Sequence, residues 1–197
     1  MKNFIYLTII VTAFSCGSSK IDLPFIGQET VQGKYQVPNF VGITQNGDTL
    51  CQKDLKGQPY VAEFFYVSCP SICPLVKSNL IKMYNEDDFS SLKFVSFTLA
   101  PEQDTPQVLQ QYASDLGVLS DQWTFVNVNF EEIYKLANGY LIAAVPEKTE
   151  DGEIPHDGRI VLVDENGHLR ATCQATDIKE LENFKKQVKN YLVHAND

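Results

Sequence analysis

The stretch FFYVSCPSICP, residues 64–74, carries the strongest structural and chemical signal in this chain. It ends an apolar run over 60–67 that predicts a buried strand, and it holds two cysteines, Cys69 and Cys73, each followed by proline. If a helix begins here, residues i and i+4 share one helical face, and Pro70 suits its first turn. Both sulfurs can then meet beside the helix N-terminus, where free N–H groups favour a thiolate.

The rest of the chain predicts strands and helices arranged around this stretch. An Asn46-Gly47 turn within 40–51 predicts a β-hairpin at the start of the domain, and Asp104 is expected to cap a helix. The other expected elements are strands over 92–99, 123–128, 159–164 and 168–173 and helices over 74–84, 104–116, 129–138 and 177–193. This order predicts an α/β fold with a central mixed sheet and helices on both faces. A dithiol between an early strand and a helix makes that sheet thioredoxin-like, with the hairpin as an N-terminal extension.

The first residues are typical of a segment that directs export. A short positive start and an apolar run over 4–14 fit a signal peptide, and small residues flank Cys16. This resembles a bacterial lipoprotein signal, which implies cleavage after residues 1–15 and a lipid on Cys16. An ordinary signal peptide with an incidental Cys16 is the alternative. Either reading predicts an extracytoplasmic protein, and the first predicts a membrane anchor on the periplasmic side of a bacterium, a tether over 16–36 and one domain over 37–197.

The charge balance argues against nucleic acid as a partner. The chain has 16 Lys+Arg against 25 Asp+Glu, a formal net charge of −9. Loss of Lys2 with the signal peptide leaves 15 against 25, or −10. Such a chain is repelled by phosphate backbones, and the sequence has no cluster of basic residues that would offset this.

The cysteines divide into a pair and three isolated residues. Of five cysteines, only Cys69 and Cys73 form a motif. Cys51 and Cys173 are expected to be packing residues, and a disulfide between them stays open because sequence does not give the separation of their Cα atoms.

The spacing of Cys69 and Cys73, with three residues between them, favours two sulfurs that share a metal ion over a compact redox loop. Two thiolates with one imidazole form a soft ligand set that prefers Cu(I) or Zn, while a closed structural zinc site needs four protein ligands. Among the three histidines, His156 lies in an acidic loop just before an expected strand, a common place for functional side chains. On the residues alone, a lone loop histidine is more often an ordinary surface residue than a ligand.

The sequence over 64–74 resembles the signature of the SCO/SenC family, thioredoxin-fold proteins that bind copper and help to assemble cytochrome c oxidase. Further similarity lies at 47–57, at 104–112 and at 156–167, so the resemblance covers about residues 38–193. It implies copper, as Cu(I) or Cu(II), held by Cys69, Cys73 and His156. It also implies a partner, the copper-site subunit of a cytochrome c oxidase.

The resemblance further implies a rigid half and a movable half of the site. The helix with Cys73 is expected to be rigid, and the loop over 145–157 is expected to become ordered when copper binds. Asp157 could orient the His156 ring through a hydrogen bond, or it could be a plain strand-entry residue.

Other functions use the same two sulfurs. In a thiol–disulfide oxidoreductase, Cys69 attacks a partner disulfide and Cys73 resolves it, which would keep target cysteines reduced. A peroxidase shares the fold, but the expected threonine and arginine near the cysteine are missing. A structural disulfide or two buried packing cysteines would need no activity at all. His156 distinguishes the copper carrier from the thiol–disulfide oxidoreductase, because metal binding needs an imidazole there and dithiol exchange does not.

Overall fold

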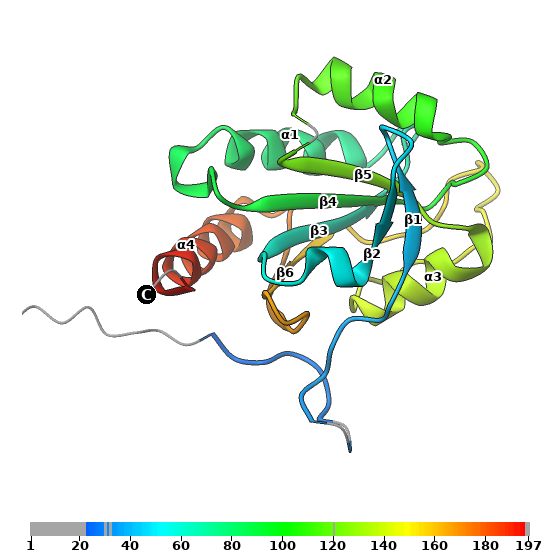
Figure 1. Cartoon of the computed structure of the whole chain (residues 1–197). Coiled ribbons are helices and arrows are strands. Elements are labelled where there is room, and N and C mark those ends of the chain that lie inside the picture. The colour runs from blue at the N-terminus through cyan, green and yellow to red at the C-terminus, as the bar shows by residue number, and fades with distance from the viewer. Residues whose placement is uncertain (1–22, 30, 32, 120, 196–197) are drawn as a thin grey trace, which may run out of the picture.

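The computed structural model describes residues 23–29, 31, 33–119 and 121–195 (Figure 1). The expected signal peptide at 1–15 and Cys16 lie outside the described residues. Within the described ranges, no helix has both the length and the apolar composition needed to cross a bilayer.

The strands form one mixed sheet, which confirms the predicted fold class. Its strand order is β2-β1-β5-β4-β3-β6-β7, with β3, β4 and β5 parallel and the remaining pairs antiparallel. The strands are β1 (Val41–Thr44), β2 (Thr49–Cys51), β3 (Tyr60–Phe65), β4 (Lys93–Thr98), β5 (Trp123–Asn127), β6 (Arg159–Val163) and β7 (Leu169–Gln174). The hairpin β1–β2 joins the sheet beside β5, as the Asn46-Gly47 turn predicted, with Gly47 at φ 85°.

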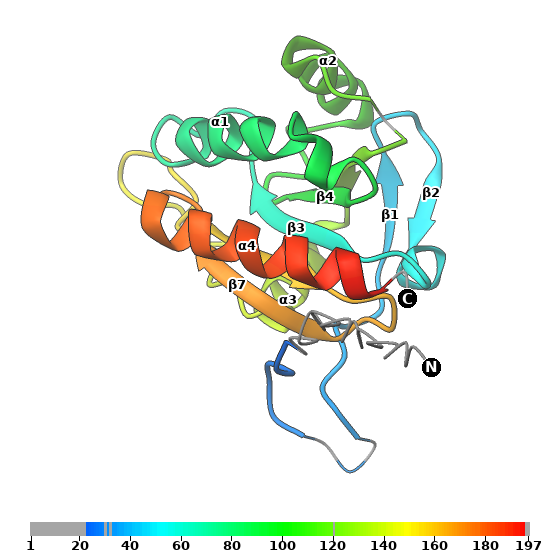
Figure 2. The ribbon, with the colours of Figure 1, turned by 90° about the vertical axis from the view of Figure 1, so that its left-hand side faces the viewer.

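Helices cover both faces of the sheet. They are α1 (Cys73–Tyr84), α2 (Pro106–Leu116), α3 (Phe130–Gly139) and α4 (Ile178–Ala195). On one face, Tyr112 of α2 stacks on Phe65 of β3, and an ion pair of 2.6 Å joins Lys185 of α4 to Glu86, just after α1. Figure 2 shows α1 and α4 on this side, with α3 behind the sheet.

The central strand β3 is buried on both faces although it contains a carboxylate. Glu63 pairs with Lys77 of α1, and each side chain is only 3% exposed. The Ser96 hydroxyl also donates to Glu63, at 2.5 Å, and in turn accepts from the indole N–H of Trp123 at 2.8 Å. The charge within this apolar strand is therefore compensated by three neighbouring side chains, directly or in relay.

Two details of the sequence interpretation are corrected. The cap of α2 is Thr105, whose side chain accepts from the Val108 N–H, while Asp104 is buried beneath the loop after β3. Cys51 and Cys173 lie on β2 and β7, the two opposite edges of the sheet, and both are free. Six strand spacings of about 4.8 Å put roughly 29 Å between those edges, so a disulfide between these two residues is excluded.

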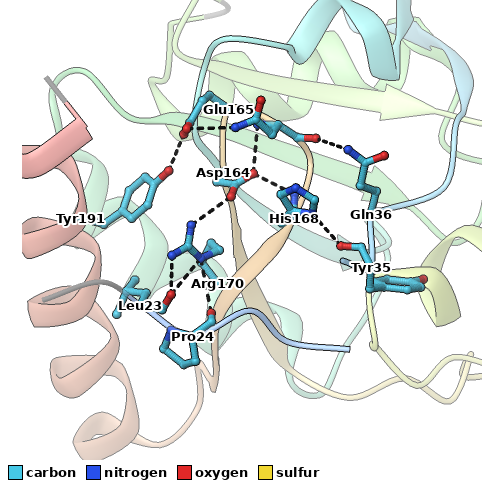
Figure 3. A network of polar contacts seen from close by, with 10 residues as sticks. Leu23, Pro24, Tyr35, Gln36, Asp164, Glu165, His168, Arg170 and Tyr191 are labelled. Atoms are coloured by element: carbon cyan, nitrogen blue, oxygen red, sulfur yellow. Dashed lines mark hydrogen bonds and ion pairs between the residues drawn. The ribbon is translucent and has the colours of Figure 1, made fainter. Parts of the chain in front are cut away.

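The N-terminal residues of the described chain lie against the turn between β6 and β7 (Figure 3). Arg170 donates to the carbonyls of Leu23, at 3.2 Å, and Pro24, at 3.4 Å, and pairs with Asp164 at 3.1 Å. This turn lies beside the start of β3, because Val163 pairs with Tyr60. The network therefore lies at the end of the sheet away from the cysteine pair.

Candidate metal centre

Three ligand-type side chains meet where β3 ends. One ligand atom each from Cys69, Cys73 and His156 lies within 4.8 Å of the others, and Cys73 Sγ is 3.2 Å from His156 Nε2. Both cysteines are buried and free, and His156 is half-buried. In the described part of the chain, this is the only such group of three found. The fold thus brings together two segments that are 83 residues apart in sequence.

The sequence interpretation expected the two sulfurs to share one helical face, but in the structure they do not. Helix α1 begins at Cys73, so its first-turn proline is Pro74 and not Pro70. Cys69 lies in the preceding loop, where its N–H donates to the Tyr66 carbonyl at 3.2 Å. The loop returns its sulfur to the start of the helix, where helix N–H groups are free. Both sulfurs still lie at the helix N-terminus, with Cys73 as the first helical residue and Cys69 in the loop before it.

The two thiols have opposite electrostatic surroundings. Burial raises the pKa of the Cys69 thiol, but hydrogen bonds from Cys73 and Ser71, including their backbone N–H groups, outweigh it and lower the pKa overall. Burial raises the pKa of the Cys73 thiol well above its ordinary value, and the nearby Cys69 and Glu63 add to the rise. Cys69 is therefore the readier thiolate of the two.

His156 lies on the returning arm of a paired hairpin loop. Ala144 and His156 form an antiparallel bridge. The N–H of Val145 donates to the Pro155 carbonyl at 3.2 Å, and the N–H of Asp157 to the Ala143 carbonyl at 3.0 Å. The base of the loop is thus held by backbone hydrogen bonds.

The ring of His156 is oriented by a main-chain carbonyl. Its Nδ1 lies 2.7 Å from the Ile154 carbonyl oxygen, which can only accept, so Nδ1 carries the proton and Nε2 offers its lone pair toward the sulfurs. The carboxylate of Asp157, which the sequence offered for this role, instead accepts from the N–H groups of Arg159, at 3.1 Å, and Ala143, at 3.4 Å. Ile154 thus has the position that Asp157 was expected to fill.

Side-chain contacts hold the histidine segment on the cysteine segment. The N–H of Ile154 donates to the Tyr66 hydroxyl at 3.3 Å, and the rings of Tyr66 and His156 meet edge-to-face at 5.4 Å. The Ser71 hydroxyl donates to Glu153 at 2.9 Å. Sequence reasoning missed these residues. The position of Tyr66 at the end of the strand could have indicated a role for it in the site. No local sequence signal connects residues 71 and 153.

The geometry suits a soft metal ion. Thiolate and imidazole ligands lie about 2.0–2.3 Å from a bound zinc ion, so they lie at most roughly 4.6 Å from one another. The observed limit of 4.8 Å falls close to that value, and the shorter contact of 3.2 Å needs only a small opening. The site also opens into a groove of about 480 Å³ between α1 and α2, whose apolar wall includes Ile81 and Tyr112. Another molecule can therefore approach the sulfurs directly.

Comparisons with known proteins agree with this geometry. The SCO1/SenC family profile matches residues 28–192. A SCO1 protein homologue of Bacillus subtilis is 24% identical over 158 residues, covering 79% of this chain and 78% of the relative.

Solved structures give the same result. A SCO1/SenC family lipoprotein from Bacillus anthracis superposes with a TM-score of 0.70 at 25% identity, covering 79% of this chain and 94% of that one. Bradyrhizobium japonicum ScoI, solved with copper bound, has a TM-score of 0.61 at 26% identity, covering 79% and 99%. With the family profile spanning most of its length and the cysteine pair and histidine brought together in space, the chain belongs to the SCO1/SenC family.

Proposed function

We propose that this protein is a copper carrier for the binuclear copper site of cytochrome c oxidase, with Cys69, Cys73 and His156 as the ligands. The observation that carries the proposal is the convergence of two thiols and one imidazole within 4.8 Å at a surface groove. Such a donor set favours Cu(I) over hard cations and can accept Cu(II). A three-ligand site leaves room for an incoming ligand, as transfer to the copper-site subunit of an oxidase requires.

The relatives support copper as the cargo. Bradyrhizobium japonicum ScoI was solved with copper bound, and it covers 79% of this chain at 26% identity. The groove beside the sulfurs also supports a carrier function. A partner that takes over the metal must place its own ligands within bonding distance of the metal, and the groove gives it access.

The proposal includes attachment to a membrane on the extracytoplasmic side. It is supported by the lipoprotein-like sequence around Cys16 and by the Bacillus anthracis relative, which is described as a lipoprotein. Mass spectrometry of the membrane fraction tests it. A lipid on Cys16 that is lost in Cys16→Ala is expected, and an unmodified Cys16 on a soluble protein would contradict it.

A copper titration of the purified domain tests the carrier function. Stoichiometric Cu(I) binding and a thiolate-to-Cu(II) absorption band are expected in the parent and lost in Cys69→Ala, Cys73→Ala and His156→Ala. Cys173→Ala and His168→Ala are matched controls, because Cys173 lies at the sheet edge and His168 contacts the Tyr35 carbonyl at 2.9 Å. Unchanged copper binding in His156→Ala would overturn the proposed ligand set.

The unequal thiols favour a second candidate, a thiol–disulfide oxidoreductase. Cys69 has the lowered pKa of an attacking thiol, and the buried Cys73 keeps its proton until it resolves the mixed disulfide. The partner disulfide gains two electrons and becomes two thiols, Cys69 and Cys73 become a disulfide, and an external thiol reductant must then restore them. Reductase turnover that persists in His156→Ala, with no copper bound by the parent, would support this function over the first.

A further inference from the structure

A hydrogen bond between Ser71 and Glu153 joins the two halves of the candidate metal centre. Neither residue offers a sulfur or an imidazole to copper. Ser71 stands between the two cysteines and is exposed, and Glu153 stands three residues before His156 and is half-buried. The hydroxyl of Ser71 donates to Glu153 Oε2 at 2.9 Å, across 82 residues of sequence.

The main chain of Glu153 is held in place by hydrogen bonds to Thr149. The N–H of Glu153 donates to the Thr149 hydroxyl at 3.1 Å, and its carbonyl accepts from the Thr149 N–H at 2.9 Å. Gly152, at φ 82°, makes the tight turn that these two bonds close. The main chain of Glu153 is therefore a fixed part of the loop, and movement of the loop away from the cysteine segment would break the bond between Glu153 and Ser71.

Glu153 is also next to the residue that orients the imidazole. Ile154 accepts from His156 Nδ1 through its carbonyl and donates to Tyr66 through its N–H. A shift at Glu153 thus passes through one peptide unit to both contacts of Ile154 and then to the ring.

We infer that Ser71 and Glu153 form a latch that sets how fast the imidazole of His156 leaves the cysteine pair. Given the proposed function, on which this inference rests, the latch controls the rate of copper release. Both residues are positioning residues, because they act on the ring through Ile154 and not on the metal.

Charge opposes closure of the latch in the copper-bound form. Cu(I) with two thiolates has a net charge of −1, and Glu153 adds another negative charge beside it. The hydrogen bond from Ser71 closes the latch, while repulsion between these charges opposes closure. Because Ser71 is exposed, a partner that occupies the Ser71 hydroxyl or the Glu153 carboxylate would open the loop at the moment of contact.

Release of Cu(I) to an excess of a bicinchoninate chelator tests the latch, using Glu153→Ala, Ser71→Ala, the double variant and Glu153→Gln. Each alanine variant is expected to release copper roughly three- to tenfold faster, the range expected for the loss of one ordinary hydrogen bond at an exposed site. The double variant should be no faster than the singles, because either change removes the same bond. Glu153→Gln keeps an acceptor without the charge, so it should release at the parental rate or more slowly. Glu150→Ala, an exposed glutamate in the same loop, is the matched control.

A metal-free measurement separates this inference from the proposed function. Hydrogen exchange at the Ile154 N–H is expected to rise in both alanine variants and to stay at the parental rate in Glu150→Ala, with little change in Tm because the pair lies at the surface. If the parent holds no copper, the carrier function fails and this exchange still decides the latch. Parental exchange and parental release in the alanine variants would overturn it. So would a Glu153→Gln variant that releases as fast as Glu153→Ala, or single effects that multiply in the double variant.

Discussion

The cysteine half and the histidine half of the candidate centre are built in different ways. Cys69 and Cys73 are each 5% exposed and line one groove with Lys77, the buried partner of Glu63. His156 is half-buried on a loop that backbone bonds close at its base and a few side-chain contacts close near its tip. The difference is one of local stability: moving a sulfur requires disturbing the core, whereas moving the imidazole requires breaking a small number of surface hydrogen bonds. Such a division would let the protein keep one half of a ligand set in place while the other half exchanges.

The largest effect is expected from breaking the support of the cysteine half. In Glu63→Gln, Lys77 loses its counter-charge while it remains enclosed by the rings of Phe65, Phe125, Trp123 and Tyr112, with its Nζ 4.2–5.6 Å from their centroids. Burial lowers the pKa of Lys77, and the Glu63 carboxylate opposes that fall. Removing one partner of a buried pair costs about 3–5 kcal/mol of unfolding free energy, which urea denaturation measures.

The pH dependence of this loss gives its cause. Without Glu63, the folded pKa of Lys77 falls further below its unfolded value, so the unfolded state binds more protons and stability rises as pH increases toward about 10. The partly exposed pair of Glu86 and Lys185 is the control: Glu86→Gln breaks this bond but leaves Lys185 paired with Glu182 at 3.1 Å, so it should cost less than about 1 kcal/mol. If Glu63→Gln lowers the unfolding free energy no more than Glu86→Gln does, the cysteine half is not supported by the core.

A second expected difference lies within the cysteine half. At pH 7, iodoacetamide should modify Cys69 more than about tenfold faster than Cys73, because only the Cys69 pKa is lowered and the thiolate is the reactive form. Peptide mass spectrometry after short exposure measures both rates. Cys173 serves as an internal reference, since burial raises its pKa to about 12 and it should react slowly. Equal rates at Cys69 and Cys73 would remove the main support for the oxidoreductase function.

The same two halves differ in how well sequence predicts them. Alternating apolar patterns and the Asn46-Gly47 turn were enough for the strands, helices and hairpin, since these signals act over a few residues. The cysteine spacing indicated that both sulfurs meet, but it placed Cys69 on the helix. The structure starts the helix at Cys73 because the loop before it folds back on Tyr66 instead of continuing the turn.

Long-range pairs were beyond sequence reasoning for a physical reason. Glu63 within an apolar strand is a local anomaly and could have indicated a buried partner, but nothing in the sequence identifies Lys77 as that partner. Ser71 and Glu153 are ordinary surface residue types in ordinary loop contexts. They meet because the fold brings the ends of β3 and of the returning loop to the same edge of the sheet, which no local propensity encodes.

A smaller effect is expected where the halves touch. Tyr66→Phe removes the acceptor of the Ile154 N–H and leaves the ring packed against His156. The loss should be about 0.5–1.5 kcal/mol, concentrated in local opening of the histidine half, so hydrogen exchange at the Ile154 N–H should speed up by up to roughly tenfold. Exchange at core strand positions such as Phe64 is the control and should follow only the global stability. Faster exchange in the strand by the same factor would mean that the two halves open together.

The smallest effect concerns a carboxylate beneath the cysteine loop. Burial raises the pKa of Asp104 above its ordinary value, while hydrogen bonds from the Thr98 hydroxyl and the Val67 N–H oppose the rise. The folded state therefore holds this proton more tightly than the unfolded state. The resulting stabilisation is complete below the unfolded pKa of about 3.9 and is lost as pH rises through the folded pKa.

Asp104→Asn removes this titration without removing the contacts, because both donors bond to the single oxygen Oδ2, at 2.5 and 3.0 Å, and an amide oxygen can accept both. The unfolding free energy of the variant relative to the parent should thus increase between about pH 3.5 and pH 7. Asp151→Asn, on the exposed loop of the histidine half, should show no such trend. A difference between Asp104→Asn and the parent that stays constant with pH, or falls as pH rises, would mean that water reaches Asp104 and that the cysteine loop rests on a solvated base.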